Sequence, residues 1–340
     1  MPLHSLAPPH AKKVTSQHST FIVDDLTQYG GGRPWSQPEE DLGRYAWQKD
    51  FAAVNDRIVF SGDMKGVYPG MEKLTRTFVS HKAKYLIIYD DAASKLPGRT
   101  FEWRLQTKGT LAAAGQKTYK ITNGEATSLV NILSPTDADW SVTTNNIGNV
   151  LCARISYRQK DNFMVLLWPD ASNLDAISEK YNSAGLAGVK VTWEGNNEYT
   201  LFQKTDNVPA SAGKIDFNGN TLILIENNTA QTLISASLVN GNMLSYNSNN
   251  FFSSTDRINF GIESISADKT EVKYNIGASS ASGGPKEVKI TFGDLLKNSS
   301  YSLVKEGDKT RIEFKTNRKG EGAVSILPDR ACRYIASIRK

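Results

Sequence analysis

The segment from Tyr29 to Trp35 carries residue types suited to binding chemistry, because it reads Tyr-Gly-Gly-Gly-Arg-Pro-Trp. Glycines adopt unusual backbone angles and let a ligand come close to the chain. A guanidinium at Arg33 can hold a carboxylate or sulfate through two parallel hydrogen bonds. The rings of Tyr29 and Trp35 can stack on sugar faces. The pattern predicts a contact site for an acidic sugar, and the alternative is a plain connection whose tryptophan covers a sheet edge.

Other residues of chemical interest are interpreted as structural. Asp90 and Asp91 form a carboxylate pair after an apolar stretch, and the small residues that follow favour a solvated turn. His81 is expected to be exposed in a turn. Trp47 and Trp103 are expected to pack in the core, the second because it lies in an alternating stretch.

The elements that position these residues are predicted to be strands. Alternation of apolar and polar residues, or short β-rich apolar runs, mark 57–63, 74–79, 85–89, 101–107, 190–193, 199–203, 221–226, 272–276, 288–292 and 310–314. Turn-forming residues stand between many of them, at 97–98, 123–124, 218–220 and 240–242. Helical character is limited to 174–181 and a turn around 293–296. The pattern indicates an all-β fold, a large antiparallel β-sandwich (super-sandwich) followed by a smaller C-terminal β-sandwich.

The polar stretch 245–254, Ser-Tyr-Asn-Ser-Asn-Asn-Phe-Phe-Ser-Ser, is predicted to be a linker. The chain is therefore divided into a tail or truncated lead-in at 1–15, a β-sandwich at 16–247 and a small C-terminal β domain at 255–340. These ranges are predictions about organisation and not about any one site.

Composition narrows the classes of partner. The 340 residues carry a net charge of +5, which favours polyanionic partners. Lysine and arginine are dispersed, and there is no zinc-finger spacing, so nucleic acid is less favoured than the two other polyanions, anionic lipid and an acidic polysaccharide. No apolar run is long enough for a membrane span. Cys152 and Cys332 lie far apart in sequence, which favours two thiols over a bridge.

Two stretches together resemble the heparinase II/III-like family of polysaccharide lyases. The first is 16–28, SQHSTFIVDDLTQ, in which a histidine is followed by Ser-Thr, an apolar strand, an aspartate and a glutamine. The second is 62–107, which contains Gly-Asp, a tyrosine, Arg-Thr, an apolar strand ending in aspartate, and Phe-Glu-Trp-Arg-Leu in the family's order. Beyond about residue 108 the likeness is only a general β-rich character.

The resemblance implies β-elimination beside a uronic acid. The enolate that develops needs its carboxylate neutralised, and the reaction needs a base and an acid. In the family the base and acid are mainly a tyrosine and a histidine of a helical toroid, which has no counterpart here. The resemblance therefore implies the β-part of a lyase, inactive by itself, whose toroid is on another chain or was lost. The alternatives are a non-catalytic carbohydrate-binding protein and a surface interaction protein without a glycan role.

The resemblance also implies a role for His18, whose family counterpart often helps to hold a structural zinc. The other ligands lie upstream in the family, and the alternative is a strand-end histidine bonded to the backbone. The start of the sequence lacks the apolar stretch of a secretory signal. The protein is either cytosolic or lacks its true N-terminus; the resemblance favours the second, and with it a periplasmic or secreted location.

Overall fold

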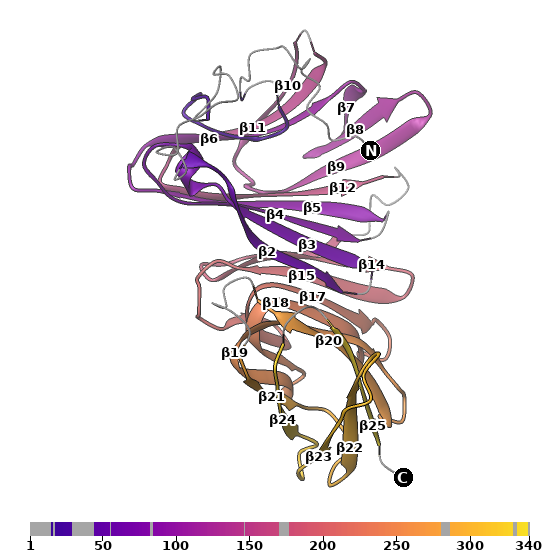
Figure 1. The fold of residues 1–340 in the computed structure, drawn as a ribbon. Helices are drawn as coiled ribbons and strands as arrows, with labels where there is room; N and C mark the ends of the chain where they lie inside the picture. Colours follow the sequence, from indigo (N-terminus) through magenta and orange to yellow (C-terminus); the bar gives the residue numbers. More distant parts are fainter. Residues whose placement is uncertain are drawn as a thin grey trace. The chain divides into compact units, whose positions relative to one another are not determined.

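The computed structural model describes residues 15, 18–28, 44–54, 56–81, 84–145, 147–169, 177–279, 286–328 and 332–338. Within these ranges the chain forms strands and one short 3-10 turn, η3 (Lys65–Val67), and no α-helix (Figure 1). Every strand pair whose register is given is antiparallel, for example β1 with β6 and β17 with β18. The prediction of an antiparallel all-β fold is confirmed.

The strands form three sheets. The four-stranded sheet has the order β1 (Phe21–Val23), β6 (Arg99–Thr107), β11 (Asn149–Arg158), β10 (Asp139–Thr144). The eight-stranded sheet has the order β2 (Trp47–Val54), β3 (Arg57–Asp63), β4 (Met71–His81), β5 (Tyr85–Ser94), β12 (Lys160–Trp168), β9 (Ala126–Ser134), β8 (Thr118–Asn123), β7 (Thr110–Gly115).

The thirteen-stranded sheet begins with β13 (Ile177–Asn182), β14 (Leu186–Trp193), β15 (Asn196–Gln203), β17 (Ile215–Asn227), β18 (Leu233–Tyr246) and β19 (Asn249–Ile265). It continues with β20 (Glu271–Ala278), β25 (Cys332–Ile338), β22 (Ser300–Lys305) and β23 (Arg311–Lys315). Three strands pair off this path: β16 (Ala210–Ala212), β21 (Val288–Phe292) and β24 (Gly322–Ile326).

The chain divides into two compact units. Unit 1 contains residues 1–49 and 60–174, and unit 2 contains residues 50–59 and 175–340. The predicted ranges 16–247 and 255–340 stay a prediction about which parts fold independently. The prediction of a linker at 245–254 is wrong, because this stretch forms the end of β18, a two-residue turn and the start of β19.

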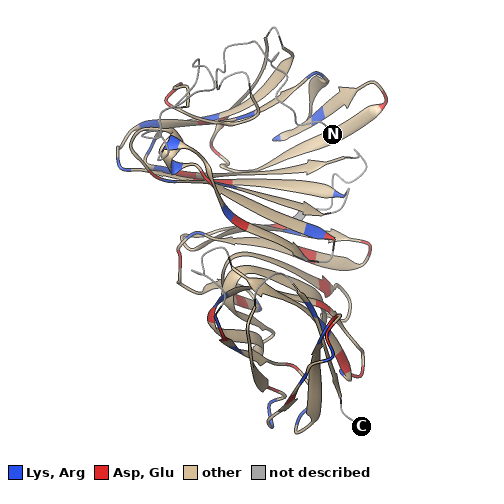
Figure 2. Ribbon diagram, viewed as in Figure 1, with Lys and Arg blue, Asp and Glu red and all other residues tan. Residues whose placement is uncertain are grey.

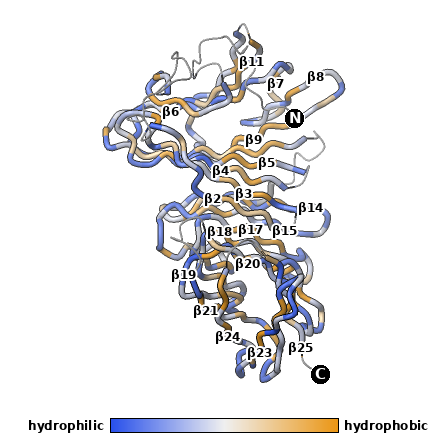
Figure 3. Tube along the Cα trace, viewed as in Figure 1, coloured by the Kyte–Doolittle hydropathy of each residue, from blue (hydrophilic) through white to orange (hydrophobic). Residues whose placement is uncertain are grey.

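The core of unit 1 lies between the four-stranded sheet and part of the eight-stranded sheet. Alternate residues of β6, such as Phe101 and Trp103, are buried in one cluster with Phe163 of β12 and Phe21 of β1. Figure 3 shows the resulting pattern, with apolar strands and polar connections. Trp103 is 1% exposed, as the alternation predicts.

Unit 2 has a separate core built from long, bent strands. Phe252, Phe260 and Tyr274 of β19 and β20 are buried together with Phe292 of β21, and the rings of Phe252 and Phe260 stack at 3.9 Å between centroids. The bends within these strands were not predicted from the sequence. The Asn-Gly clusters at 218–220 and 240–242, predicted as turns, lie inside β17 and β18.

These clusters are β-bulges, which explains the wrong prediction. Register shifts occur at Asn218/Gly219 and at Leu238/Gly241, and Gly219 pairs with Gly241. A Cβ atom on either glycine would lie 2.5 Å from the Leu238 side chain. Glycine is therefore required for close approach within the strands and not for reversal of the chain.

The predicted helix at 174–181 is also wrong where the structure describes it. Residues from Ile177 form β13, which pairs antiparallel with β14 through, for example, Tyr181 and Gly188. A short segment gains more from completing a sheet than from an isolated two-turn helix, so tertiary pairing overrides local propensity.

Candidate functional site

The two stretches that carry the sequence resemblance meet in unit 1. Phe21 of the first stretch pairs with Trp103 of the second, and Val23 pairs with Phe101. The Tyr68 hydroxyl donates to the Phe21 carbonyl at 2.7 Å. β1 has only three residues, so these contacts hold it on the edge of β6 and fix the segment that precedes it.

An ion pair completes this attachment at the other end of β1. Asp24 accepts a hydrogen bond from the Thr100 backbone N–H at 2.7 Å and lies 2.5 Å from Nε of Arg99. The Arg99 guanidinium also donates to the Pro69 carbonyl from two nitrogens, at 3.2 Å each. The aspartate of the resembling motif thus has a structural role in closing the turn after β1.

His18 lies in the bend before β1 and is half-buried. Its backbone N–H donates to the Thr15 carbonyl at 3.1 Å, and the neighbouring Ser19 hydroxyl accepts from the Gln106 backbone N–H at 2.9 Å. Burial lowers the pKa of His18, which favours the neutral imidazole that binds metals. In the part of the chain that the structure describes, however, no three His, Cys, Asp or Glu side chains gather. These residues do not fit a complete zinc site, and zinc at His18 stays a prediction.

An arginine cluster occupies the face of β6 and β11 opposite the core. Arg154 holds both carboxylate oxygens of Asp25 at 2.7 Å and also contacts Glu102 at 3.0 Å. Arg104 pairs with the same Glu102. The Arg154 side chain is 39% exposed and that of Asp25 is 61% exposed, so this cluster is open to solvent.

The charges of this cluster stabilise one another. The hydrogen bond from Arg154 holds the pKa of the Asp25 carboxyl below its usual range, and the same contact raises the pKa of Arg154. Two arginines meet two carboxylates, so the local charge is balanced. Figure 2 shows the charged residues of the described chain, with Lys and Arg interspersed with Asp and Glu along the strands.

Tyr29, Arg33 and Trp35 lie outside the described residues, so their role stays a prediction. The segment that contains them follows Gln28, which is described. The Gln28 backbone N–H donates to the Thr15 hydroxyl at 2.8 Å. Gln28, the last described residue before the predicted contact loop, is thus attached to the segment just before His18.

The structure corrects the interpretation of Asp90 and Asp91, which are buried within β5 and not in a solvated turn. Asp90 accepts from Arg76 of β4 through both oxygens, at 2.7 and 2.8 Å. Asp91 lies 2.5 Å from the Lys73 ammonium. Burial raises the pKa of Asp90, and the Arg76 guanidinium opposes this rise. The cations of the preceding strand are the signal that the sequence offered: Arg76 pairs in register with Asp90, and Lys73 lies two residues along the strand from Thr75, the partner of Asp91.

Two further expectations are wrong. Trp47, expected in the core, is 57% exposed at the start of β2. His81, expected in an exposed turn, is 5% exposed at the end of β4, where its ring meets the edge of Tyr85 at 5.4 Å. β4 extends past the predicted end at Val79 and includes His81, whereas no strand was predicted where β2 begins at Trp47. Cys152 and Cys332 are not joined by a disulfide bridge, in agreement with the expectation of two thiols.

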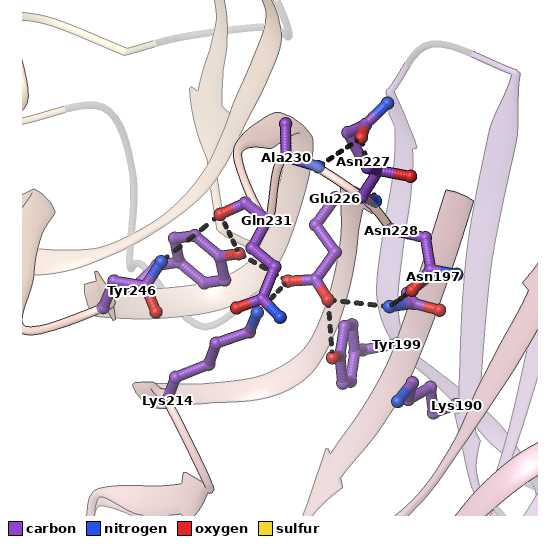
Figure 4. A network of polar contacts seen from close by, with 12 residues as sticks. Lys190, Asn197, Tyr199, Lys214, Glu226, Asn227, Asn228, Ala230, Gln231 and Tyr246 are labelled. Carbon is purple, nitrogen blue, oxygen red and sulfur yellow. Dashed lines mark hydrogen bonds and ion pairs between the residues drawn. The ribbon is translucent and has the colours of Figure 1, made fainter. Parts of the chain in front are cut away.

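A polar network in unit 2 was missed by sequence reasoning. Figure 4 shows Glu226 of β17, 1% exposed, among donors from two other strands, β15 and β18, and from the turn before β17. Its Oε1 accepts from the Asn197 amide and the Tyr199 hydroxyl, both at 2.9 Å. Its Oε2 contacts the Lys214 ammonium at 2.7 Å and accepts from the Tyr246 hydroxyl.

The network holds its groups in fixed protonation states. Burial pushes the pKa of Glu226 up, but hydrogen bonds from Lys214, Tyr246, Asn197 and Tyr199 outweigh it and keep the pKa below its usual range. Burial raises the pKa values of Tyr199 and Tyr246, and the Glu226 carboxylate adds to this. The tyrosines therefore remain neutral donors and are unsuited to act as phenolate bases.

Comparison with known proteins gives matches to solved structures alone. No family model and no curated protein matches the chain. Among solved structures, a heparan sulfate lyase from Pedobacter heparinus is 14% identical, with a TM-score of 0.42, over 56% of this chain and 31% of that one. One heparinase III matches at 11% identity and a TM-score of 0.40, over 63% of this chain and 30% of that one. Another matches at 11% identity and 0.42, over 55% and 29%.

These structures are of the kind that the sequence resemblance names. The chain spans about 30% of their length. No helix among the described residues is long and apolar enough to cross a membrane.

Proposed function

We propose that this chain is the β-rich part of a lyase that acts by β-elimination on acidic, uronate-containing polysaccharide, and that it does not cleave this substrate by itself. In this view the chain contributes polysaccharide contacts, and a helical toroid supplies the base and the acid. Such a protein would meet its substrate in the periplasm or outside the cell.

The observation that supports the proposal most directly is the pairing of the two stretches that resemble the lyase family. Residues 16–28 and 62–107 are separated in sequence, yet they form one structural group through β1 and β6. The group includes the bend with His18 and the arginine cluster around Arg154. A chance likeness of two short stretches would not require them to pair in register.

The arginine cluster suits the proposed substrate. Arg154 already holds a carboxylate in the two-pronged geometry that a uronate would use. Because Asp25 is exposed, a ligand carboxylate or sulfate can compete for the same guanidinium. Arg33, in the segment that follows Gln28, is proposed as a second cation for the same polysaccharide, with Tyr29 and Trp35 as stacking rings.

The buried tyrosines support inactivity of the chain alone. A β-eliminating base must accept the proton at C5 of the uronate while an acid protonates the leaving oxygen. Burial raises the pKa of Tyr68 and Tyr89 as it does for the two tyrosines around Glu226. These phenols are therefore poor bases at neutral pH.

The test is the affinity of the purified chain for hyaluronan, heparan sulfate and alginate, measured by affinity electrophoresis. Replacement Arg33→Ala should remove a charge-assisted contact worth about 1.5–3 kcal/mol. This corresponds to an affinity loss of about tenfold to a hundredfold. Arg311→Ala removes the same charge from an exposed position of β23 in unit 2 and serves as the control. Equal losses in both variants would refute a specific role for the loop.

A further inference from the structure

A cavity of about 440 Å³ lies at one end of unit 2, where the turns of several hairpins converge. It is lined by residues from the β17–β18 connection, the β18–β19 turn, the β19–β20 turn and the segment after β21. Small-ligand pockets commonly fall between about 300 and 1,000 Å³. The cavity is therefore large enough for a small ligand, and it is separate from the arginine cluster of unit 1.

The backbone around this cavity is strained at four separate turns. Gln231, Asn247, Lys269 and Asp294 all line it, and their φ angles are 50°, 52°, 56° and 57°. Left-handed backbone is uncommon for residues other than glycine, and such residues gather at functional sites more than elsewhere. Four different connections contribute one such residue each, so the cavity is a shared feature of this end of the unit.

The wall behind the cavity is rigid. The Tyr246 ring lines it, and the hydroxyl of this tyrosine is fixed by Glu226 and by the Gln231 carbonyl at 2.9 Å (Figure 4). Phe251 meets Tyr246 edge-on at 6.2 Å between ring centroids. Glu226 is thus a positioning residue for the cavity: it holds the tyrosine without lining the cavity itself.

The chemistry of the lining favours an uncharged, hydroxyl-rich ligand. Four residues that carry an amide or a hydroxyl line the cavity, Gln231, Thr232, Asn247 and Asn249, and together they supply the donors and acceptors that sugar hydroxyls require. The Asn247 amide also lies 3.4 Å from the Gln231 carbonyl, to which it donates. Apolar side chains share the lining, such as Ile265, and match the C–H faces of a pyranose ring.

Charge argues against an acidic group or a metal ion in this cavity. Lys269 is the cation that lines it, and its ammonium lies 2.7 Å from the Asp294 carboxylate. Among its described residues, the cavity thus offers a uronate or sulfate a single ammonium that is already paired, and no guanidinium with the two-pronged geometry of Arg154. Among the lining residues that the structure describes, Asp294 is the one carboxylate, and the ammonium beside it would repel a bound divalent cation.

We propose that this cavity binds a neutral sugar residue of a polysaccharide chain, and that this contact is distinct from the one proposed for the arginine cluster of unit 1. The identification of the ligand as a sugar rests on the proposed function. The site itself rests on the cavity, the strained turns and the amide-rich lining. A neutral sugar next to uronates in one chain would let the two units contact the same polysaccharide through different chemistry.

The test uses the whole chain, with chitohexaose and cellohexaose as neutral probes and a hyaluronan hexasaccharide as the acidic one, in titration calorimetry. Asn247→Gly removes the amide while keeping a residue that tolerates the positive φ. Asn207→Gly is the matched control, because Asn207 also has a positive φ, 61°, and does not line the cavity. Asn249→Ala gives a second reading at the first residue of β19, which also lines the cavity, should the first variant not fold.

We expect a neutral probe to bind, with an affinity unchanged at about 1 M salt, where charge interactions are screened beyond about 3 Å. Loss of one neutral hydrogen bond should weaken binding about threefold to tenfold in Asn247→Gly or Asn249→Ala, and not in Asn207→Gly. Absence of binding by both neutral probes, or equal affinities of all variants, would overturn the inference. Binding of the acidic probe alone, abolished by salt, would overturn it while leaving the proposed function intact.

Discussion

Replacement Glu226→Gln tests how much the buried network stabilises unit 2. Glutamine keeps the volume and one carbonyl oxygen, so Asn197 and Tyr199 can retain their acceptor. The substitution removes the charge that Lys214 and Tyr246 contact. A charge-assisted hydrogen bond contributes about 1.5–3 kcal/mol. The Lys214 side chain is 25% exposed, so solvent compensates part of its loss. We expect unit 2 to lose about 2–4 kcal/mol.

The stability that Glu226 contributes depends on pH, and the direction follows from its lowered pKa. The folded-state pKa of Glu226 lies below its ordinary value, so its contribution is present above the unfolded-state pKa, about 4.3. It is lost as the pH falls through the folded-state value. The stability difference between wild type and Glu226→Gln should therefore be full at pH 7 and shrink in acid below about pH 4.

The assay is urea unfolding of both proteins at pH 7 and in acid, followed by tryptophan fluorescence and by circular dichroism. Glu287→Gln is the control, because Glu287 is exposed in the same unit. If Glu226→Gln and Glu287→Gln agree within about 0.5 kcal/mol, the typical range of neutral surface changes, the network contributes nothing to stability. A loss that stays constant from pH 7 into acid would show that charge is not its cause.

Two further substitutions test the packing of unit 2. The Arg57 side chain is 10% exposed, and its Nε lies 3.1 Å from the Glu198 carboxylate. Glu198→Ala removes this partner and leaves the guanidinium buried. Thermal or urea unfolding should therefore show a stability loss of about 3–5 kcal/mol. We expect the double variant Arg57→Met, Glu198→Leu to recover most of that stability, because it removes both buried charges. No recovery would contradict this explanation. Gly293→Ala places a Cβ atom 1.7 Å from a backbone carbonyl oxygen of the neighbouring strand and should cost about 1–3 kcal/mol or more. Gly185→Ala meets nothing within 4 Å, and an equal melting temperature for the two variants would refute the clash.

Sequence reasoning predicted strands well because alternation reports directly which face is buried. The bounds of β3 and β21 agree with the predicted 57–63 and 288–292. The Asn-Gly pair at 123–124 leads from β8 into a turn, whereas those at 218–220 and 240–242 are bulges. The residue types are the same in all three. Only the pairing of Gly219 with Gly241 across two strands distinguishes them, and that contact is not local.

The candidate sites show the same limit. The Asp90 carboxylate was placed in a turn because its strand was predicted to end at Tyr89, and the register with Arg76 was unknown. Glu226 ends an apolar strand and has no motif around it. Its partners come from 197 to 246 in sequence and meet only in the folded sheet. Short motifs could be recognised, but groups assembled across strands could not.

The most direct test of the central claim is retardation of the purified chain in native gels that contain heparan sulfate, hyaluronan or alginate, with the unsaturated product of β-elimination monitored in the same mixtures. The account predicts retardation by at least one acidic polysaccharide at low salt, weakened at high salt because exposed charges are screened beyond about 10 Å at 0.1 M. It also predicts no appreciable unsaturated product. Absence of retardation by every acidic polysaccharide at low salt would contradict polysaccharide contact, and robust product formation would contradict dependence on a separate toroid.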